Sequence, residues 1–252
     1  MSRTAAVNPL ASIGVVLLVD VVLLLSLDAV TAATAIALEL ALMPLAGVRA
    51  RRLAPRVGAV AAAAVLVAVT VALYGRSSGA VLLSAGFVQV SAGSLALAAA
   101  TALRLVAIGL PAAVLFPDLD ATRLADGLGQ RLHLPDRFVL AGLAGFRLFE
   151  VLGDDWRAIA LARRARGVGD AGRLRRLPGQ AFALLVVALR RAVVLATAME
   201  ARGLGAPGRR TWSRPSTFGR PDVVVIAAGV VVAVGSLAVG LAAGTYRLVL
   251  IT

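Results

Sequence analysis

The sequence predicts an all-α polytopic membrane protein with about five transmembrane helices and one charged module that holds two long helices. Hydrophobic residues make up 60% of the 252 residues, and the mean hydropathy is +0.92. The chain contains five apolar stretches of at least 18 residues, each with at most one charge. Because a soluble domain is only about half apolar, most of this chain is expected to face lipid.

Each of the five stretches is long enough to cross a hydrocarbon core, which takes about 20 helical residues. The first stretch carries Asp20 and the second carries Glu39, whereas the third and the fifth contain no charge. Apolar segments continue after the first stretch and no small-residue cleavage site is evident, so we expect a retained span rather than a signal peptide. The expected spans are 10–27, 29–48, 57–74, 90–116 and 223–246.

The stretch 80–117 contains a single charge, Arg104, but its 38 residues are too many for one straight span, since that helix would measure about 57 Å. Arginine concentrates in cytoplasmic loops, which places both the cluster at 49–56 and the arginine-rich region that follows inside the cell. One crossing must therefore return within this stretch. We assign it to 90–116 and expect 80–89 to form a shallow or re-entrant helix. The predicted topology has a cytoplasmic N-terminus, five crossings and an external C-terminus.

Residues 118–220 hold 18 of the 26 basic residues, all of them arginine, and 9 of the 13 acidic residues. Their apolar runs are only about nine residues long, which suits amphipathic helices better than spans. Proline favours helix starts and glycine favours helix ends, so we expect helices over 135–166 and 178–202, each followed by a glycine, Gly167 and Gly203. The expected domains are membrane helices at 1–117, a cytoplasmic helical module at 118–220 and a C-terminal membrane helix at 221–252.

Both long helices are expected to finish in one pattern, A-x-x-A-R-G, at 162–167 and 198–203. Two alanines three residues apart lie on one side of a helix and allow close approach, while arginine extends a planar fork of donors. One interpretation is ordinary helix termination, because arginine complements the helix dipole and glycine often follows the last turn. Recurrence on two successive helices favours the other interpretation, a pair of tips that dock into grooves.

These motifs make the chain similar to the transmembrane T component of energy-coupling factor (ECF) transporters, the CbiQ/EcfT-like family of ATP-binding-cassette importers. The paired motifs of that family correspond to Ala165-Arg166-Gly167 and Ala201-Arg202-Gly203, the second within AMEARG. The resemblance runs over almost the whole chain. Its other matches are Asn8-Pro9, Leu103-Arg104-Leu105, the segment LFPDLDATRLADGLGQRLHLPDRF, and a basic aromatic segment from Arg209 to Trp212.

The resemblance implies a division of labour among several proteins in a bacterial cell membrane. Two cytoplasmic ATPase subunits hydrolyse ATP, a small membrane S component binds a vitamin or a transition-metal ion, and the T component connects them. The chain is then a non-catalytic subunit with no cofactor or metal of its own, whose two long helices are coupling helices. Because selectivity belongs to the S component, the sequence does not specify the substrate. The residues that the resemblance assigns to ATPase docking are Ala165, Arg166, Gly167, Ala201, Arg202 and Gly203.

Three ionisable residues, Asp20, Glu39 and Arg104, lie inside predicted spans. Such groups are costly in lipid and usually face a partner or a cavity. We expect one of the two acids to pair with Arg104. The alternative is a proton or ion relay, which an ATP-powered importer does not require.

Other chemistries are excluded or disfavoured by composition. The chain has no cysteine and one histidine, His133, which excludes thiol sites and histidine clusters; we expect His133 in a loop or cap. The absence of lysine excludes a Walker ATP-binding loop. The segment DGLGQR lacks the further spaced aspartates of a membrane phosphotransferase, and the adjacent Asp154 and Asp155 point in different directions on a helix. Aromatic residues are too scarce, at 4%, to favour nucleic acid.

Two other functions fit the same spans. An ordinary ATP-binding-cassette permease would form the substrate pathway itself and would present one cytoplasmic coupling loop instead of two arginine-tipped helices. A membrane scaffold without a transport role would bind no ATPase.

Overall fold

The computed structural model describes residues 7–26, 28–46, 50–75, 78, 80–85, 88–167, 172–205, 212 and 214–244. The chain divides into two compact units. The first, called here the membrane unit, comprises residues 1–120 and 217–252, and the second, the arginine-rich unit, comprises residues 121–216. Apart from one short hairpin, the regular structure of the described residues is helical, and the predicted all-α class is confirmed.

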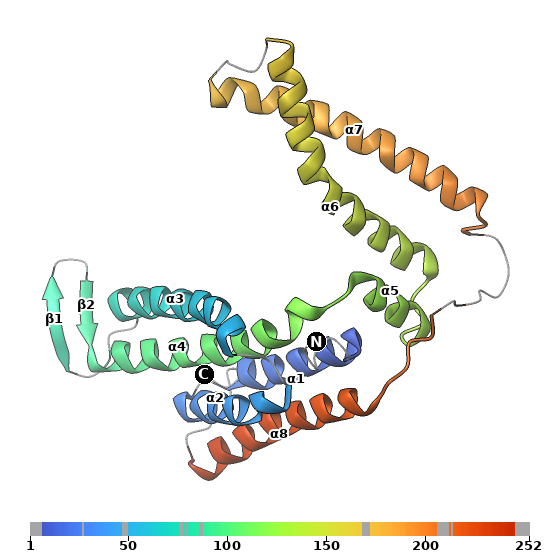
Figure 1. The fold of residues 1–252 in the computed structure, drawn as a ribbon. Coiled ribbons are helices and arrows are strands. Elements are labelled where there is room, and N and C mark those ends of the chain that lie inside the picture. Colours follow the sequence, from blue (N-terminus) through green and yellow to red (C-terminus); the bar gives the residue numbers. More distant parts are fainter. Residues whose placement is uncertain are drawn as a thin grey trace. The chain divides into compact units, whose positions relative to one another are not determined.

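The membrane unit contains the five helices that the apolar stretches predicted (Figure 1). α3 packs along α4, α1 and α2 both pack against α8, and α4 also contacts α1 and α2. Short 3₁₀ turns continue α2 over Met43–Ala46 and α4 over Phe116–Asp118. The helices are α1 (Pro9–Leu25), α2 (Ala29–Leu42), α3 (Ala50–Tyr74), α4 (Ala92–Leu115) and α8 (Arg220–Ala242).

Side-chain caps start these helices where the sequence places short polar residues. The Asn8 side chain accepts a hydrogen bond from the Leu10 N–H at 3.0 Å, with Pro9 in the first helical position. Asp28 caps α2 by accepting from the Thr31 N–H at 3.1 Å. At α4, Ser91 and Ser94 each accept a hydrogen bond from the other's backbone N–H, at 3.1 and 3.0 Å. Each cap satisfies a backbone donor that the helix leaves open.

The expected helix over 80–89 is wrong. This segment contributes to a two-stranded antiparallel hairpin of β1 (Val81–Ala85) and β2 (Val88–Ser91), in which Ser84 pairs with Gln89 and Ala85 with Val88. A short apolar run does not distinguish a strand from a helix by periodicity. The β-branched Val81, Val88 and Val90 favour strand here, and β2 leads directly into the Ser91 cap of α4.

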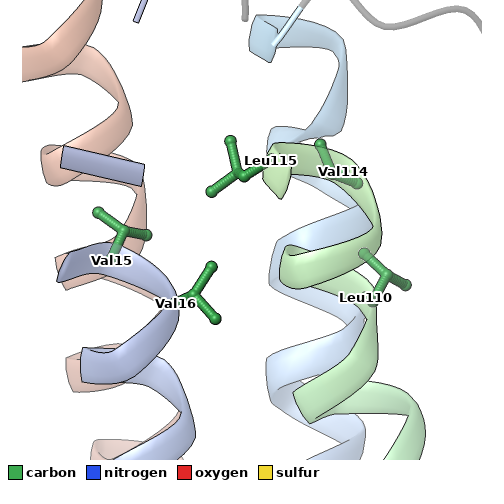
Figure 2. Close-up of a cluster of buried hydrophobic side chains, with 5 residues drawn as sticks. All are labelled: Val15, Val16, Leu110, Val114 and Leu115. Atoms are coloured by element: carbon green, nitrogen blue, oxygen red, sulfur yellow. The ribbon is translucent and has the colours of Figure 1, made fainter. Parts of the chain in front are cut away.

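Small side chains bring the membrane helices close together around two clusters of buried side chains. Figure 2 shows the first cluster, which consists of Val15 and Val16 on α1 and Leu110, Val114 and Leu115 on α4. The second cluster consists of Val19, Leu23, Ala35, Ala107 and Val232. At Gly229 on α8, an added Cβ would meet the Val15 side chain, so glycine permits that approach. Packing through small residues is the usual way in which helices associate in lipid.

The arginine-rich unit contains α5 (Ala121–Gln130), α6 (Asp136–Ala165) and α7 (Arg173–Ala201) (Figure 1). α6 follows its predicted range, whereas α7 begins five residues before the expected start at Pro178. The Arg176 N–H already donates to the Gly172 carbonyl at 3.2 Å. Pro178 therefore lies inside the helix, near its beginning, and does not mark its first turn.

Four described helices are long and apolar enough to cross a membrane by length and composition. Three are expected spans, on α3, α4 and α8, and the fourth is Arg176–Ala201 on α7. α1 and α2 are apolar but shorter, with 17 and 14 residues. The sequence predicts α7 outside the membrane because Arg190 and Arg191 end its nine-residue apolar run. α7 thus combines the length and mean hydropathy of a span with two central charges.

Candidate functional site

The ends of α6 and α7 have the same backbone geometry. Arg166 caps α6 with φ −89° and ψ 7°, and Arg202 caps α7 with φ −88° and ψ 8°. The N–H of Arg166 donates to the Ala162 carbonyl at 3.3 Å, and the N–H of Arg202 donates to the Ala198 carbonyl at 3.2 Å. The repeated sequence pattern is therefore also a repeated structure.

A left-handed glycine ends each helix, as predicted. Gly167 has φ 72° and Gly203 has φ 85°, a conformation that costs other L-residues energy. The Gly203 N–H donates to the Glu200 carbonyl at 2.9 Å, and the Leu204 N–H donates to the Met199 carbonyl at 3.0 Å. This pair of bonds is the Schellman arrangement, which turns the chain away sharply after the last helical residue.

Both tips are open to solvent. The six residues of the two Ala-Arg-Gly motifs are all exposed. Among the residues that the structure describes, the ion pairs are Arg157 with Asp154 and Arg191 with Asp155, and neither includes Arg166 or Arg202. Each tip therefore presents a cation in front of a helix C-terminus, with its guanidinium donors available to carboxylates and carbonyls of another molecule.

The two tips lie near opposite ends of α7. The Arg163 guanidinium, one turn before Arg166, approaches Gly179, with Nη2 3.2 Å from where a Cβ would stand. From Gly179 to Ala201 the axis of α7 extends about 33 Å. One molecule thus carries two similar cationic tips separated by roughly the diameter of a small domain.

Polar contacts join α6 to α7 between the tips. The Gln180 side chain, which is 1% exposed, donates from Nε2 to the Trp156 carbonyl at 2.9 Å. The Arg191 guanidinium donates to both carboxylate oxygens of Asp155, at 2.8 and 3.3 Å. Asp154 and Asp155 are thus engaged with arginines. These contacts hold α6 and α7 together between the tips.

The ionisable residues of the spans do not form the expected ion pair. In the described part of the chain, Arg104 is paired with neither Asp20 nor Glu39; it interacts electrostatically with Asp28, which precedes α2. Pairing depends on the rotation of α1, α2 and α4 about their axes, which the sequence leaves open. Both carboxylate oxygens of Glu39 and the Oδ1 atom of Asp20 are buried without a hydrogen-bond partner.

Two polar links were not predicted from the sequence. Asp222 on α8 accepts from the Asn8 N–H at 2.5 Å and from the Gly219 N–H at 2.6 Å, and so joins the starts of α1 and α8. The Gln130 side chain at the end of α5 donates to the Arg214 carbonyl and accepts from the Ser216 N–H, both at 2.7 Å. In the sequence Asn8 belongs to the Asn8-Pro9 motif, and no residue near Gln130 indicates its distant partners.

Two further features noted in the sequence are the basic aromatic segment after α7 and His133 between α5 and α6. Residues 209–211 of the basic aromatic segment lie outside the described residues, while Trp212 lies against Gly129, where an added Cβ would be 2.7 Å from the ring. The Arg131 Nε donates to the Ser216 carbonyl at 3.0 Å. His133 lies in the loop between α5 and α6, as expected, with φ 51°.

The chain is similar to known transport proteins. A family model described as CbiQ, cobalt transport protein, matches residues 5–211, which include both tips. A curated relative, the energy-coupling factor transporter transmembrane protein EcfT of Limosilactobacillus fermentum, is 30% identical over 161 residues. The alignment covers 59% of this chain and 60% of the relative. The chain therefore spans less than two thirds of the length of that relative.

Proposed function

Because the chain belongs to the CbiQ family of cobalt transport proteins, we propose that it is the transmembrane coupling subunit of an energy-coupling factor importer. It passes the conformational change of two cytoplasmic ATPase subunits to a small membrane S component that binds the substrate. The chain itself hydrolyses no ATP. The S component selects the substrate, a vitamin or a transition-metal ion.

The observation that carries this proposal is the pair of equivalent, exposed tips near the two ends of α7. Arg166 and Arg202 have cap dihedral angles that agree within a few degrees, and the intervening helix extends about 33 Å. A single small domain would not reach both ends of α7. Two copies of one type of subunit would offer two equivalent grooves, one for each tip. Ordinary helix termination requires neither exposure nor repetition of the arginine.

The chemistry of arginine suits binding in such a groove. A guanidinium held between groove carboxylates and carbonyls forms charge-assisted, bidentate hydrogen bonds. Removing one partner of a buried pair of this kind typically costs about 2 to 5 kcal/mol. Lysine retains the charge but loses the planar fork, so we expect an Arg→Lys change at either tip to weaken docking as well.

The distribution of charge supports a cytoplasmic location for α6 and α7. An arginine at the centre of a membrane helix costs about 2.5 to 3.5 kcal/mol on insertion scales, and α7 has two in succession, Arg190 and Arg191. Arg191 also pairs with Asp155 of α6, a helix that does not qualify as a span. The exposed Phe182 and Leu189 then provide an apolar face toward lipid or the S component.

The test is co-purification of the ATPases with a variant that lacks the arginine side chain at both tips. We expect Arg166→Ala combined with Arg202→Ala to leave the protein in the membrane and to release both ATPase subunits on detergent purification. The matched control is Arg137→Ala combined with Arg157→Ala, which removes two exposed arginines from α6 away from the tip. The control should retain the ATPases.

Two results would contradict the proposal. Retention of both ATPases by the double tip variant would show that the arginines do not hold them. Equal loss in the control would show that general positive charge, rather than the tips, binds the ATPases.

A further inference from the structure

A buried carboxylate without a partner lines an apolar pocket in the membrane unit. Glu39 on α2 is 8% exposed, and neither of its carboxylate oxygens has a hydrogen-bond partner. Charged groups at membrane depth are normally paired or face a water-filled cavity. Among the described residues, Glu39 has no such partner.

The pocket has room for the end of a side chain. It has a volume of about 100 Å³ and is formed by α1, α2, α4 and α8. Four of the side chains in Figure 2, Val15, Leu110, Val114 and Leu115, form part of its wall. Val224 on α8 also lines it and is 46% exposed, so the pocket is accessible from the surface of this unit. One buried water needs only about 10 to 15 Å³, so the pocket is several times larger than a single water requires.

The charges around the pocket are unbalanced. Asp20 on α1 is close enough to Glu39 for the two carboxyl groups to interact electrostatically, and its Oδ1 atom is also buried without a partner. Among the described residues no basic group forms an ion pair with either acid. The pocket wall thus carries one carboxyl group, that of Glu39, with the carboxyl group of Asp20 nearby.

We propose that this pocket receives a basic side chain from a transmembrane helix of the S component. This inference rests on the proposed function, which supplies a small membrane protein as the partner. A lysine or arginine entering from the membrane side complements Glu39 and Asp20, and its aliphatic stem complements the apolar wall. A lipid amine is the competing occupant, and the experiments below separate the two.

The first experiment replaces Glu39 in the complete complex, purified from the native host with ATPases and S component. Glu39→Leu should reduce the S component recovered per ATPase at least about tenfold, because loss of one partner of a buried charged pair costs more than 1.4 kcal/mol. Glu39→Gln should give an intermediate loss. Ser236→Ala, at a buried polar position on α8 outside the pocket wall, is the matched control and should retain the S component.

The stability of the isolated chain should not fall when Glu39 is replaced. Since Glu39 has no hydrogen-bond or ion-pair partner among the residues that the structure describes, Glu39→Leu should keep or raise the melting temperature in detergent, which excludes misfolding as the reason for losing the S component. A lower melting temperature would show that Glu39 stabilises the membrane unit itself, and would overturn the proposal.

The second experiment identifies the occupant. The chain has no cysteine, so Val224→Cys carries a single site for a maleimide–benzophenone crosslinker. The expected product joins this position to a transmembrane helix of the S component that contains a lysine or arginine, and replacing that residue by leucine should reproduce the Glu39→Leu loss. Crosslinking to lipid alone, or full retention of the S component by Glu39→Leu, would overturn the inference. In either case ATPase retention through Arg166 and Arg202 is measured separately, so the proposed function is judged independently.

Discussion

Single residues fix the relation between segments that are distant in the sequence. Asp222 is 2% exposed and accepts two backbone hydrogen bonds, from Asn8 at the start of α1 and from Gly219 before α8. Because water is absent from the membrane core, open backbone donors near it are costly. One carboxylate therefore joins the first and the last membrane helix of the described chain.

We expect Asp222→Ala to lower the free energy of unfolding by about 2 kcal/mol, because the buried Asn8 N–H and the partly buried Gly219 N–H both lose their acceptor. Thermal unfolding of the purified protein in detergent measures this loss as a lower melting temperature. Asp154→Ala is the control, since that exposed carboxylate has 80% side-chain exposure, and it should change stability by less than about 0.5 kcal/mol. Equal melting temperatures for the two variants would contradict a structural role for Asp222.

At the scale of elements, the ends of α6 and α7 show how a six-residue pattern determines a local structure. The cap residue stays close to the helical region and the following glycine reverses the sign of φ, at 72° for Gly167 and 85° for Gly203. Since the bonds that form the cap are local, the sequence is sufficient to predict it. The beginning of α7 was less predictable, because Pro178 is compatible with several positions in the first turns.

Gly167→Ala tests whether the left-handed cap positions the arginine. A Cβ at Gly167 would meet no atom within 4 Å, so its cost, about 1 to 2 kcal/mol, comes from the backbone conformation alone. We expect weaker ATPase binding in a co-purification assay, with normal membrane insertion. Gly145→Ala, inside α6 and also without a neighbour within 4 Å, should retain full binding because alanine is favoured there. Identical binding by the two variants would exclude the cap from docking.

At the scale of the whole molecule, the net charge of +13 is distributed in a way that predicts orientation. Arginines gather at 49–56 and in the arginine-rich unit, while the hairpin lies between two apolar helices. The positive-inside rule then predicts that both arginine clusters lie on the cytoplasmic side. A crossing by α7 would instead place its two ends on opposite sides of the membrane.

Single-cysteine variants of this cysteine-free chain test the topology. We expect a membrane-impermeant maleimide to label Ser78→Cys in intact cells, and to label Arg164→Cys and Glu200→Cys only after permeabilisation. All three positions are exposed, so accessibility depends on the side of the membrane. Labelling of only one of the two α6–α7 positions in intact cells would show that α7 crosses.

The sequence by itself determined the features that depend on local chemistry. Continuous apolar length gave the five membrane helices, because a helix that satisfies its own backbone is the structure that lipid favours. The A-x-x-A-R-G pattern gave the two helix ends, because every bond of that cap lies within one turn.

Only the tertiary structure decided the features that depend on how helices rotate and pack. It replaced the expected helix at 80–89 by a hairpin, joined Asn8 to Asp222, and left Glu39 facing an apolar pocket without a partner. The physical reason is the same in each case. The partners of a residue on another helix depend on the relative positions of whole segments, and an apolar sequence allows many such positions of similar energy until close packing selects one.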